Sequence, residues 1–110
     1  MNEIKKLQLE AVLKEIGLAN APEVVRTEIL GKLDTAVDRL VIESFWKNLS
    51  EEETEHFRDF SLQMVRVRPN LSAEGVLYEF MALYDSLTEK VSADLDEFLA
   101  RFVADFKAGV

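Results

Sequence analysis

The sequence contains no cysteine and only one histidine, His56. Without cysteine the chain has no disulfide, no thiolate ligand for a metal and no cysteine nucleophile. Serine catalysis needs a base and an acid that orients it, and His56 is the one imidazole available. No serine stands in the setting of a nucleophile elbow. The sequence therefore predicts no catalytic residue, and we expect a protein that is not an enzyme.

Glycine, proline and long apolar runs are also scarce. The chain has four Gly and two Pro in 110 residues, few for an all-β protein, and its glycines are too scattered to form a phosphate-binding loop. No apolar run approaches the ~20 residues that a membrane-spanning helix needs. Polar residues interrupt the apolar region that an N-terminal signal peptide would require. We therefore expect a cytoplasmic protein that does not bind a membrane.

Positive charge is in short supply. Asp and Glu number 21 against 13 Lys and Arg, which gives a formal net charge of −8. An acidic surface keeps a protein soluble and disfavours direct binding to nucleic acid or to anionic membranes. The one class that such a charge would suit is an inhibitor that imitates nucleic acid with rows of carboxylates.

Hydrophobic residues, alanine included, make up 48% of the chain. They recur at helical spacing in five segments. We expect helices over residues 2–16, 20–48, 50–67, 73 to about 87, and 93–107. Each of these segments begins or ends at a capping residue, a glycine or a proline. The predicted fold is all-α, a compact bundle of four to five helices with no β-strands, in a single domain over residues 1–110.

Several helix ends carry specific signals. Gly17 can adopt the left-handed conformation that ends a helix at low steric cost. Asn20 and Ser50 are each followed three residues later by glutamate, which predicts N-caps of the capping-box type. Ser72 and Ser92 also stand where a helix needs a cap. We assign these serines to capping rather than to chemistry.

The join between the fourth and fifth segments admits two interpretations. Apolar residues from Leu77 to Leu87 line one face, and those from Leu95 to Phe106 continue it almost in phase, so one helix of about 35 residues is possible. Such a helix would run about 50 Å, well beyond the ~26 Å diameter of a compact domain of this length. We therefore predict a kink or short turn between about Thr88 and Ala93.

Two residues of the third segment have the spacing of a metal site. Glu53 and His56 have the Glu-x-x-His spacing of half a di-iron centre, which needs a second such pair from another helix. Because there is no second histidine, we interpret them as a solvated glutamate and a histidine at the edge of a buried stripe. A weak surface site of Glu52, His56 and Asp59 is the alternative. We predict that no metal or other cofactor is required.

Arg66 and Arg68 form the one small basic cluster of the chain. Guanidinium groups can grip an anionic ligand. They also stabilise the negative end of a helix, and these two lie at the predicted end of the third segment. We favour the second interpretation.

A resemblance extends from about Leu13 to Lys107. The run Ile16-Gly17-Leu18, then Pro22-Glu23, then a long helix with Arg39 and Leu40, and finally residues 49–53 (Leu-Ser-Glu-Glu-Glu) carry it. On these motifs the chain resembles a family of small, acidic, helical proteins of unknown function that is common in candidate-phylum bacteria. It departs from that family in its longer aromatic-rich stretch over residues 76–87. The resemblance implies a helical fold in a bacterial cytosol, and it brings no catalytic residue, cofactor or partner.

The second segment carries apolar residues outside its main stripe. Ile42, Phe45, Trp46 and Leu49 add apolar surface around another side of that helix, and Trp46 points away from the stripe centre. If another helix covers this side, Trp46 belongs to the core. If the side is open, it forms an apolar patch of the kind that marks an interaction site, with Trp46 as its anchor.

The function that we expect is non-enzymatic protein–protein interaction by a helical adaptor or regulatory domain. Its candidate partner-binding residues are Ile42, Phe45, Trp46 and Leu49, and the sequence specifies neither the partner nor the oligomeric state. The alternative is an acidic, nucleic-acid-mimicking inhibitor of a nucleic-acid-binding protein, such as a phage-encoded anti-defence protein. A third reading, a binder of a small molecule or metal in a pocket between helices, has less support. Acidic residues spread over every segment favour the adaptor.

Overall fold

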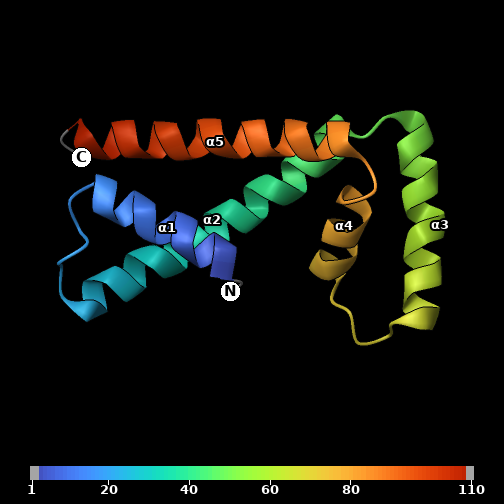
Figure 1. Ribbon diagram of the computed structural model, residues 1–110, viewed down its shortest axis with the longest axis horizontal. Helices are drawn as coiled ribbons and strands as arrows, with labels where there is room; N and C mark the ends of the chain where they lie inside the picture. The colour runs from blue at the N-terminus through green and yellow to red at the C-terminus, as the bar shows by residue number, and fades with distance from the viewer. Residues whose placement is uncertain (1–2, 109–110) are drawn as a thin grey trace. The chain divides into compact units, whose positions relative to one another are not determined.

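Each helical segment of the sequence forms helix in the computed structural model, which describes residues 3–108 (Figure 1). The helices are α1 (Glu3–Glu15), α2 (Glu23–Asn48), α3 (Glu51–Val67), α4 (Ala73–Met81) and α5 (Asp85–Lys107). Residues 3–108 contain no strand, so the predicted all-α fold is confirmed. Within the same range, no helix is both long and apolar enough to cross a membrane. Asn2, where the first helix was predicted to begin, lies outside the described residues.

The end of α1 is set by Gly17, as the sequence predicted. Gly17 has a φ of 83°, the left-handed conformation that side chains with a Cβ rarely adopt. Its N–H donates to the carbonyl oxygen of Lys14 at 3.1 Å, and the N–H of Leu18 donates to that of Leu13 at 2.9 Å. These two bonds make a Schellman motif, which satisfies carbonyl groups that the helix itself leaves without partners.

The start of α2 differs from the prediction. The helix begins at Glu23, and the N–H of Arg26 donates to the carbonyl oxygen of Pro22 at 3.1 Å, so Pro22 is the N-cap residue. The predicted cap at Asn20 is therefore wrong. A residue that precedes proline is disfavoured in helical geometry, and this keeps Ala21 out of the helix.

The predicted caps of α3 and α4 are confirmed. Ser50 Oγ accepts from the N–H of Glu53 at 3.1 Å, while Glu53 Oε1 accepts from the N–H of Ser50 at 2.9 Å. This reciprocal pair is a capping box. Ser72 Oγ accepts from the N–H of Gly75 at 3.0 Å at the start of α4. Four-residue signals of this kind act locally, which is why the sequence alone predicts them.

The predicted break between Thr88 and Ala93 is wrong. The helix α5 runs without interruption from Asp85 to Lys107, so Ser92 lies inside it and is not an N-cap. The chain turns instead at residues 82–84, between α4 and α5. The prediction assumed one small sphere around a single core, whereas α5 contributes to two compact units.

Each unit is a group of residues that contact mainly one another. Unit 1 comprises Met1–Ile42 and Asp94–Val110, and unit 2 comprises Glu43–Ala93. Both α2 and α5 contribute residues to each unit. The single domain predicted over residues 1–110 stays a prediction.

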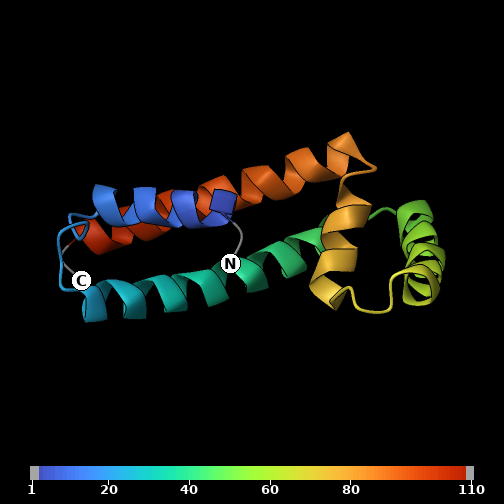
Figure 2. The same cartoon turned by 60° about the horizontal axis from the view of Figure 1, so that its bottom comes forward.

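Unit 1 is built from α1, the first part of α2 and the last part of α5, and α1 lies between the other two in Figure 1. Figure 2 shows the same three helices from another side. Its buried apolar residues are Leu9, Val12, Leu13, Ile16, Leu33, Val37, Val41 and Val103. The three from α2 are spaced by four and therefore share one face of that helix. They belong to the stripe that the periodicity predicted.

Unit 2 combines the end of α2 with α3, α4 and the first turns of α5. Its buried apolar residues are Phe45, Leu77, Phe80, Met81, Leu87 and Val91. The helix α3 contributes no fully buried residue, because Phe57, Phe60 and Met64 on its inner face are half-buried. Thus α3 covers one side of the core of unit 2, while its own inner face stays partly exposed.

The glycines of α1 and α2 provide a matched test of backbone conformation. We expect Gly17→Ala to destabilise the protein by about 1 kcal/mol, because alanine is strained at a positive φ. We expect Gly31→Ala to stabilise it by about 0.5–1 kcal/mol, since Gly31 lies within α2 and a Cβ there meets no atom within 4 Å. Urea titration measures both. Equal effects of the two substitutions would contradict the left-handed assignment.

Two serines provide a test of the caps. We expect Ser50→Ala to lower the free energy of unfolding by about 1 kcal/mol, the usual value for an N-cap. Ser92→Ala is the control, because Ser92 is exposed inside α5, and alanine there should be neutral or slightly stabilising. A loss at Ser92 as large as that at Ser50 would show that α5 begins at residue 92 in solution.

Candidate functional site

The four predicted partner-binding residues occupy different environments. Phe45 is fully buried at 0% exposure, whereas Trp46 is 52% exposed. Leu49 is half-buried, and Ile42 is 39% exposed. Ile42 is the last residue of the first segment of unit 1, while the other three belong to unit 2. The candidate site is therefore confined to unit 2, with Trp46 as its accessible aromatic residue.

Trp46 packs in edge-to-face geometry with two other rings. Its ring centroid lies 5.4 Å from that of Phe45 and 5.4 Å from that of Phe57, with interplanar angles of 81° and 82°. Edge-to-face geometry of this kind is favourable beyond the apolar area that it buries. One side of the indole is thus packed between α2 and α3, and about half of its surface stays open to solvent.

Trp46 belongs to a larger set of rings, called here the aromatic cluster, which consists of Phe45, Trp46, His56, Phe57, Phe60, Phe80 and Tyr84. Phe80 of α4 is fully buried within it. Its centroid lies 6.1 Å from Phe45, 5.1 Å from His56, 5.0 Å from Phe57, 5.4 Å from Phe60 and 5.2 Å from Tyr84. One side chain therefore joins α2, α3 and the connection that leads into α5.

His56 has a structural role in this cluster. Its Nδ1 is hydrogen-bonded to the hydroxyl of Tyr84, and its ring stands edge-on to Phe60 and Phe80. The described residues contain no group of three His, Cys, Asp or Glu side chains that could hold a metal ion. The surface site of Glu52, His56 and Asp59 that the sequence left open is therefore not formed there.

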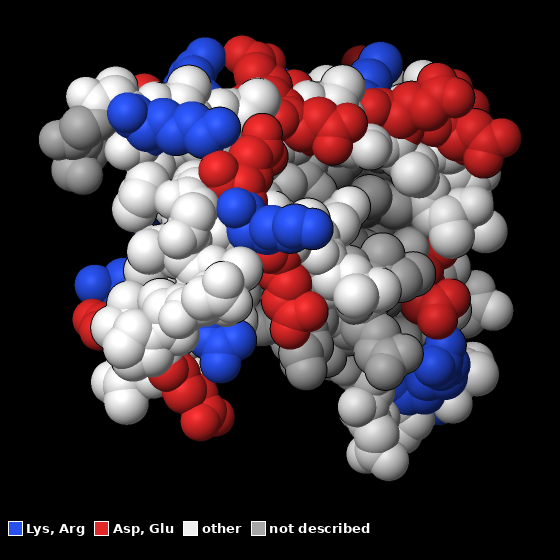
Figure 3. Space-filling model, turned by 60° about the vertical axis from the view of Figure 1, so that its left-hand side comes forward, with Lys and Arg blue, Asp and Glu red and all other residues white. Residues whose placement is uncertain are grey.

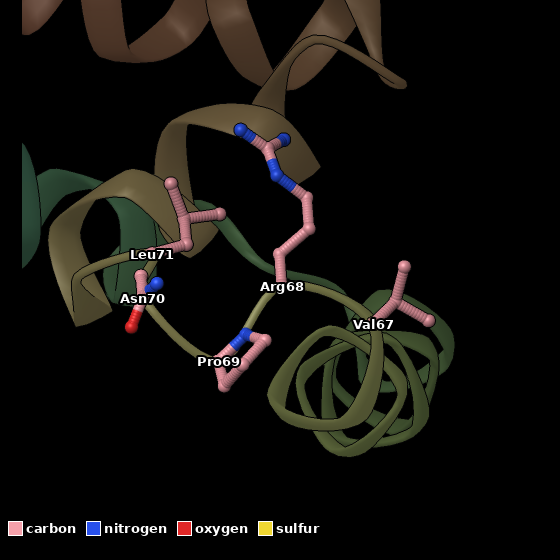
Figure 4. Close-up of a pocket in the computed structure, with 5 residues that line it drawn as sticks. All are labelled: Val67, Arg68, Pro69, Asn70 and Leu71. Carbon is pink, nitrogen blue, oxygen red and sulfur yellow. The ribbon is translucent and has the colours of Figure 1, made fainter.

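One of the two basic residues at the end of α3, Arg68, forms an ion pair across the loop. The side chain of Arg68 extends from the loop toward α4 (Figure 4), where its Nη1 lies 3.0 Å from Oε1 of Glu79. The pair borders a shallow hollow lined by Val67, Arg68, Pro69, Asn70 and Leu71. Because both side chains are about half exposed, we expect the pair to contribute only ~0.2–1 kcal/mol. The guanidinium of Arg68, which could have bound an anion, is thus already paired with the carboxylate of Glu79.

Some exposed apolar residues of unit 2 were missed by the sequence analysis. Leu62 is 62% exposed, Val65 67% and Val67 66%, all on α3, and Leu83 is 56% exposed just before α5. Leu62 and Val65 lie off the stripe of Phe57, Phe60 and Met64, and this displacement on the helical wheel was the available signal. Isolated exposed apolar residues are normal on a protein surface.

The charged surface carries both signs. On the face shown in Figure 3, acidic side chains lie among basic and uncharged ones. Several acidic residues also stand in the first turns of helices, as Glu51, Glu52 and Glu53 do in α3. Carboxylates in this position stabilise the positive end of a helix. Part of the net charge therefore has a structural explanation.

No protein family model, no curated protein and no solved structure matches the chain. The resemblance over residues 13–107 to a family of small acidic helical proteins stays a prediction.

The different burial of two adjacent aromatic residues can be measured. We expect Phe45→Ala to cost about 3–5 kcal/mol, the range for a buried phenylalanine. We expect Trp46→Ala to cost roughly half as much, because the indole already exposes 52% of its surface. Denaturant titration checks both values, and an equal loss for the two variants would place Trp46 in the core.

Proposed function

We propose that the chain is a non-enzymatic interaction domain of the cytoplasm that binds another protein through Trp46 and the adjoining Leu49. One observation carries the proposal. Trp46 is the only tryptophan of the chain. It is packed on one side against other rings, and 52% of its surface is exposed to solvent. No catalytic residue, cofactor, nucleic acid or membrane is part of the proposal.

The contacts of Trp46 suit it to be an anchor. Tryptophan is among the residues that dominate binding energies when a partner buries them. Binding is weakened by the entropy lost when a side chain becomes ordered. Edge-to-face contacts with Phe45 and Phe57 already restrict the indole in the free protein. A partner that covered its open side would gain apolar burial at a low ordering cost.

The alternative is an acidic inhibitor that imitates nucleic acid, and the net charge of −8 is what favours it. Binding energy in such a complex comes from carboxylates that meet a basic surface, so the complex weakens steeply as salt rises. An interface anchored by tryptophan depends far less on salt. The two functions therefore differ in one measurable property.

We expect Trp46→Ala to abolish capture of a partner from extracts of the native cell at both low and high salt. Leu62→Ala, which removes an apolar residue of α3 that is even more exposed than Trp46, should capture the partner as the wild type does. Circular dichroism at the capture temperature checks that both variants are folded. With the purified partner, the emission of Trp46 should shift to the blue. Capture that persists in Trp46→Ala and disappears at high salt would refute the proposal and favour the acidic inhibitor.

A further inference from the structure

The connection between α4 and α5 contains no residue that prevents a helix. It consists of Ala82, Leu83 and Tyr84, with neither glycine nor proline. Ala82 itself keeps right-handed helical geometry, with φ of −63° and ψ of −17°. Sharp bends in helices normally have an identifiable cause such as proline. Here α4 nevertheless turns away from the first turns of α5 (Figures 1 and 2).

The apolar pattern of this region is that of one helix. The buried residues Leu77, Phe80, Met81, Leu87 and Val91 lie on one face of an ideal helical wheel that runs through the connection. The same face continues to Phe106 in the last turns of α5. A straight helix over residues 73–107 would therefore keep these buried side chains on one side.

Specific hydrogen bonds hold the bend. The N–H groups of Leu83 and Tyr84 donate to the carbonyl oxygens of Phe80 and Met81, each at 3.0 Å, in the tighter three-residue pattern. Thr88 Oγ1 reaches back across the bend and donates to the same carbonyl of Met81 at 2.7 Å. This hydroxyl contact joins the first turn of α5 to the end of α4.

A straight helix would replace these bonds. The first N–H groups of any helix lack partners within it, and here they are those of residues 85–87. In a continuous helix they would donate to the carbonyl oxygens of residues 81–83. The contacts given up would be the Thr88 hydroxyl bond and the hydrogen bond of Tyr84 with His56. Backbone hydrogen bonding therefore permits both the bent and the straight form of residues 82–84.

A single chain could not straighten without a large loss of packing. Leu87 and Val91 of α5 are buried in unit 2 and Val103 is buried in unit 1, and a helix that runs straight on from α4 would remove α5 from both cores. The surface complementary to these residues is present in every other copy of the same chain. A second copy could restore all of the α5 contacts, which is the condition for domain swapping.

We propose that residues 82–84 form a hinge that straightens, so that two copies of the chain exchange α5 and form a domain-swapped dimer. In this dimer α1–α4 of one copy pack against α5 of the other. The partner is therefore identical to the chain itself, and the new structure is confined to the hinge.

The primary test compares the wild type with Asp85→Pro after refolding from urea at high and at low protein concentration. Proline is favourable at the first position of a helix, where Asp85 lies, but would remove a backbone bond from a continuous helix. By size-exclusion chromatography with light scattering, we expect a dimer of the wild type at high concentration and only monomer of the variant. If Asp85→Pro does not fold, Leu83→Gly replaces it, because Leu83 is exposed and glycine disfavours the long helix. A monomeric wild type under both conditions, or dimers of the hinge variants equal to its own, would overturn the proposal.

A second comparison addresses the hydroxyl that holds the bend. Thr88→Val should raise the ratio of dimer to monomer roughly 5-fold for each of the two hinges, the effect of losing one ordinary hydrogen bond. Thr35→Val is the matched control, since its Oγ1 also donates to a backbone carbonyl, that of Gly31 at 3.0 Å, but inside α2. It should leave the ratio unchanged. An equal ratio for the two variants would show that Thr88 does not restrain the hinge.

Spin labels at Ala73 and Ala93, both exposed, distinguish exchange from simple association. The distance between the two labels of one chain is measured in dimers formed with an excess of unlabelled chain. It should be about 30 Å, the length of 20 residues of continuous helix. A dimer in which this distance equals that of the bent monomer would exclude the exchange of α5.

Discussion

The ring of Phe80 contacts rings from α2, from α3 and from the residue that immediately precedes α5, and no part of it is open to solvent. Aromatic residues bury large apolar areas, and edge-to-face pairs add to that stabilisation. The helix α3 has no fully buried residue of its own, so its attachment depends on the rings that it shares with Phe80. The packing of unit 2 follows from this one side chain.

The exposure of Trp46 is a consequence of the same arrangement. Phe45 and Trp46 are neighbours in α2, and successive residues of a helix point about 100° apart. When Phe45 points at Phe80, Trp46 must point to the flank of the core, where Phe57 supports only one of its sides. The accessible indole is thus fixed by the burial of its neighbour.

Features that depend on a few adjacent residues were predictable from the sequence. The left-handed Gly17 and the capping box of Ser50 need no knowledge of the rest of the fold, and both are present. The start of α2 was mislocated because Pro22 excludes the preceding residue from the helix, which outweighed the capping pattern of Asn20. The bend before α5 could not be located, since the apolar phase continues through it and Thr88 acts only once the chain has turned. The helical wheel likewise shows where Phe45 and Trp46 point, but not which helix lies there.

The partner-binding indole and the hinge are different parts of unit 2. The indole of Trp46 is supported by Phe45 and Phe57, and both residues lie on the same side of the hinge as Trp46. Exchange of α5 alters the contacts of Tyr84 and Thr88 but leaves those two supports in place. A ligand shifts an equilibrium only when it binds the two states with different affinity. A partner that touches Trp46 and its supports alone would therefore bind the monomer and the exchanged dimer equally well. The dimer would present two such sites and gain avidity for a partner with two matching surfaces, without any new contact at either one.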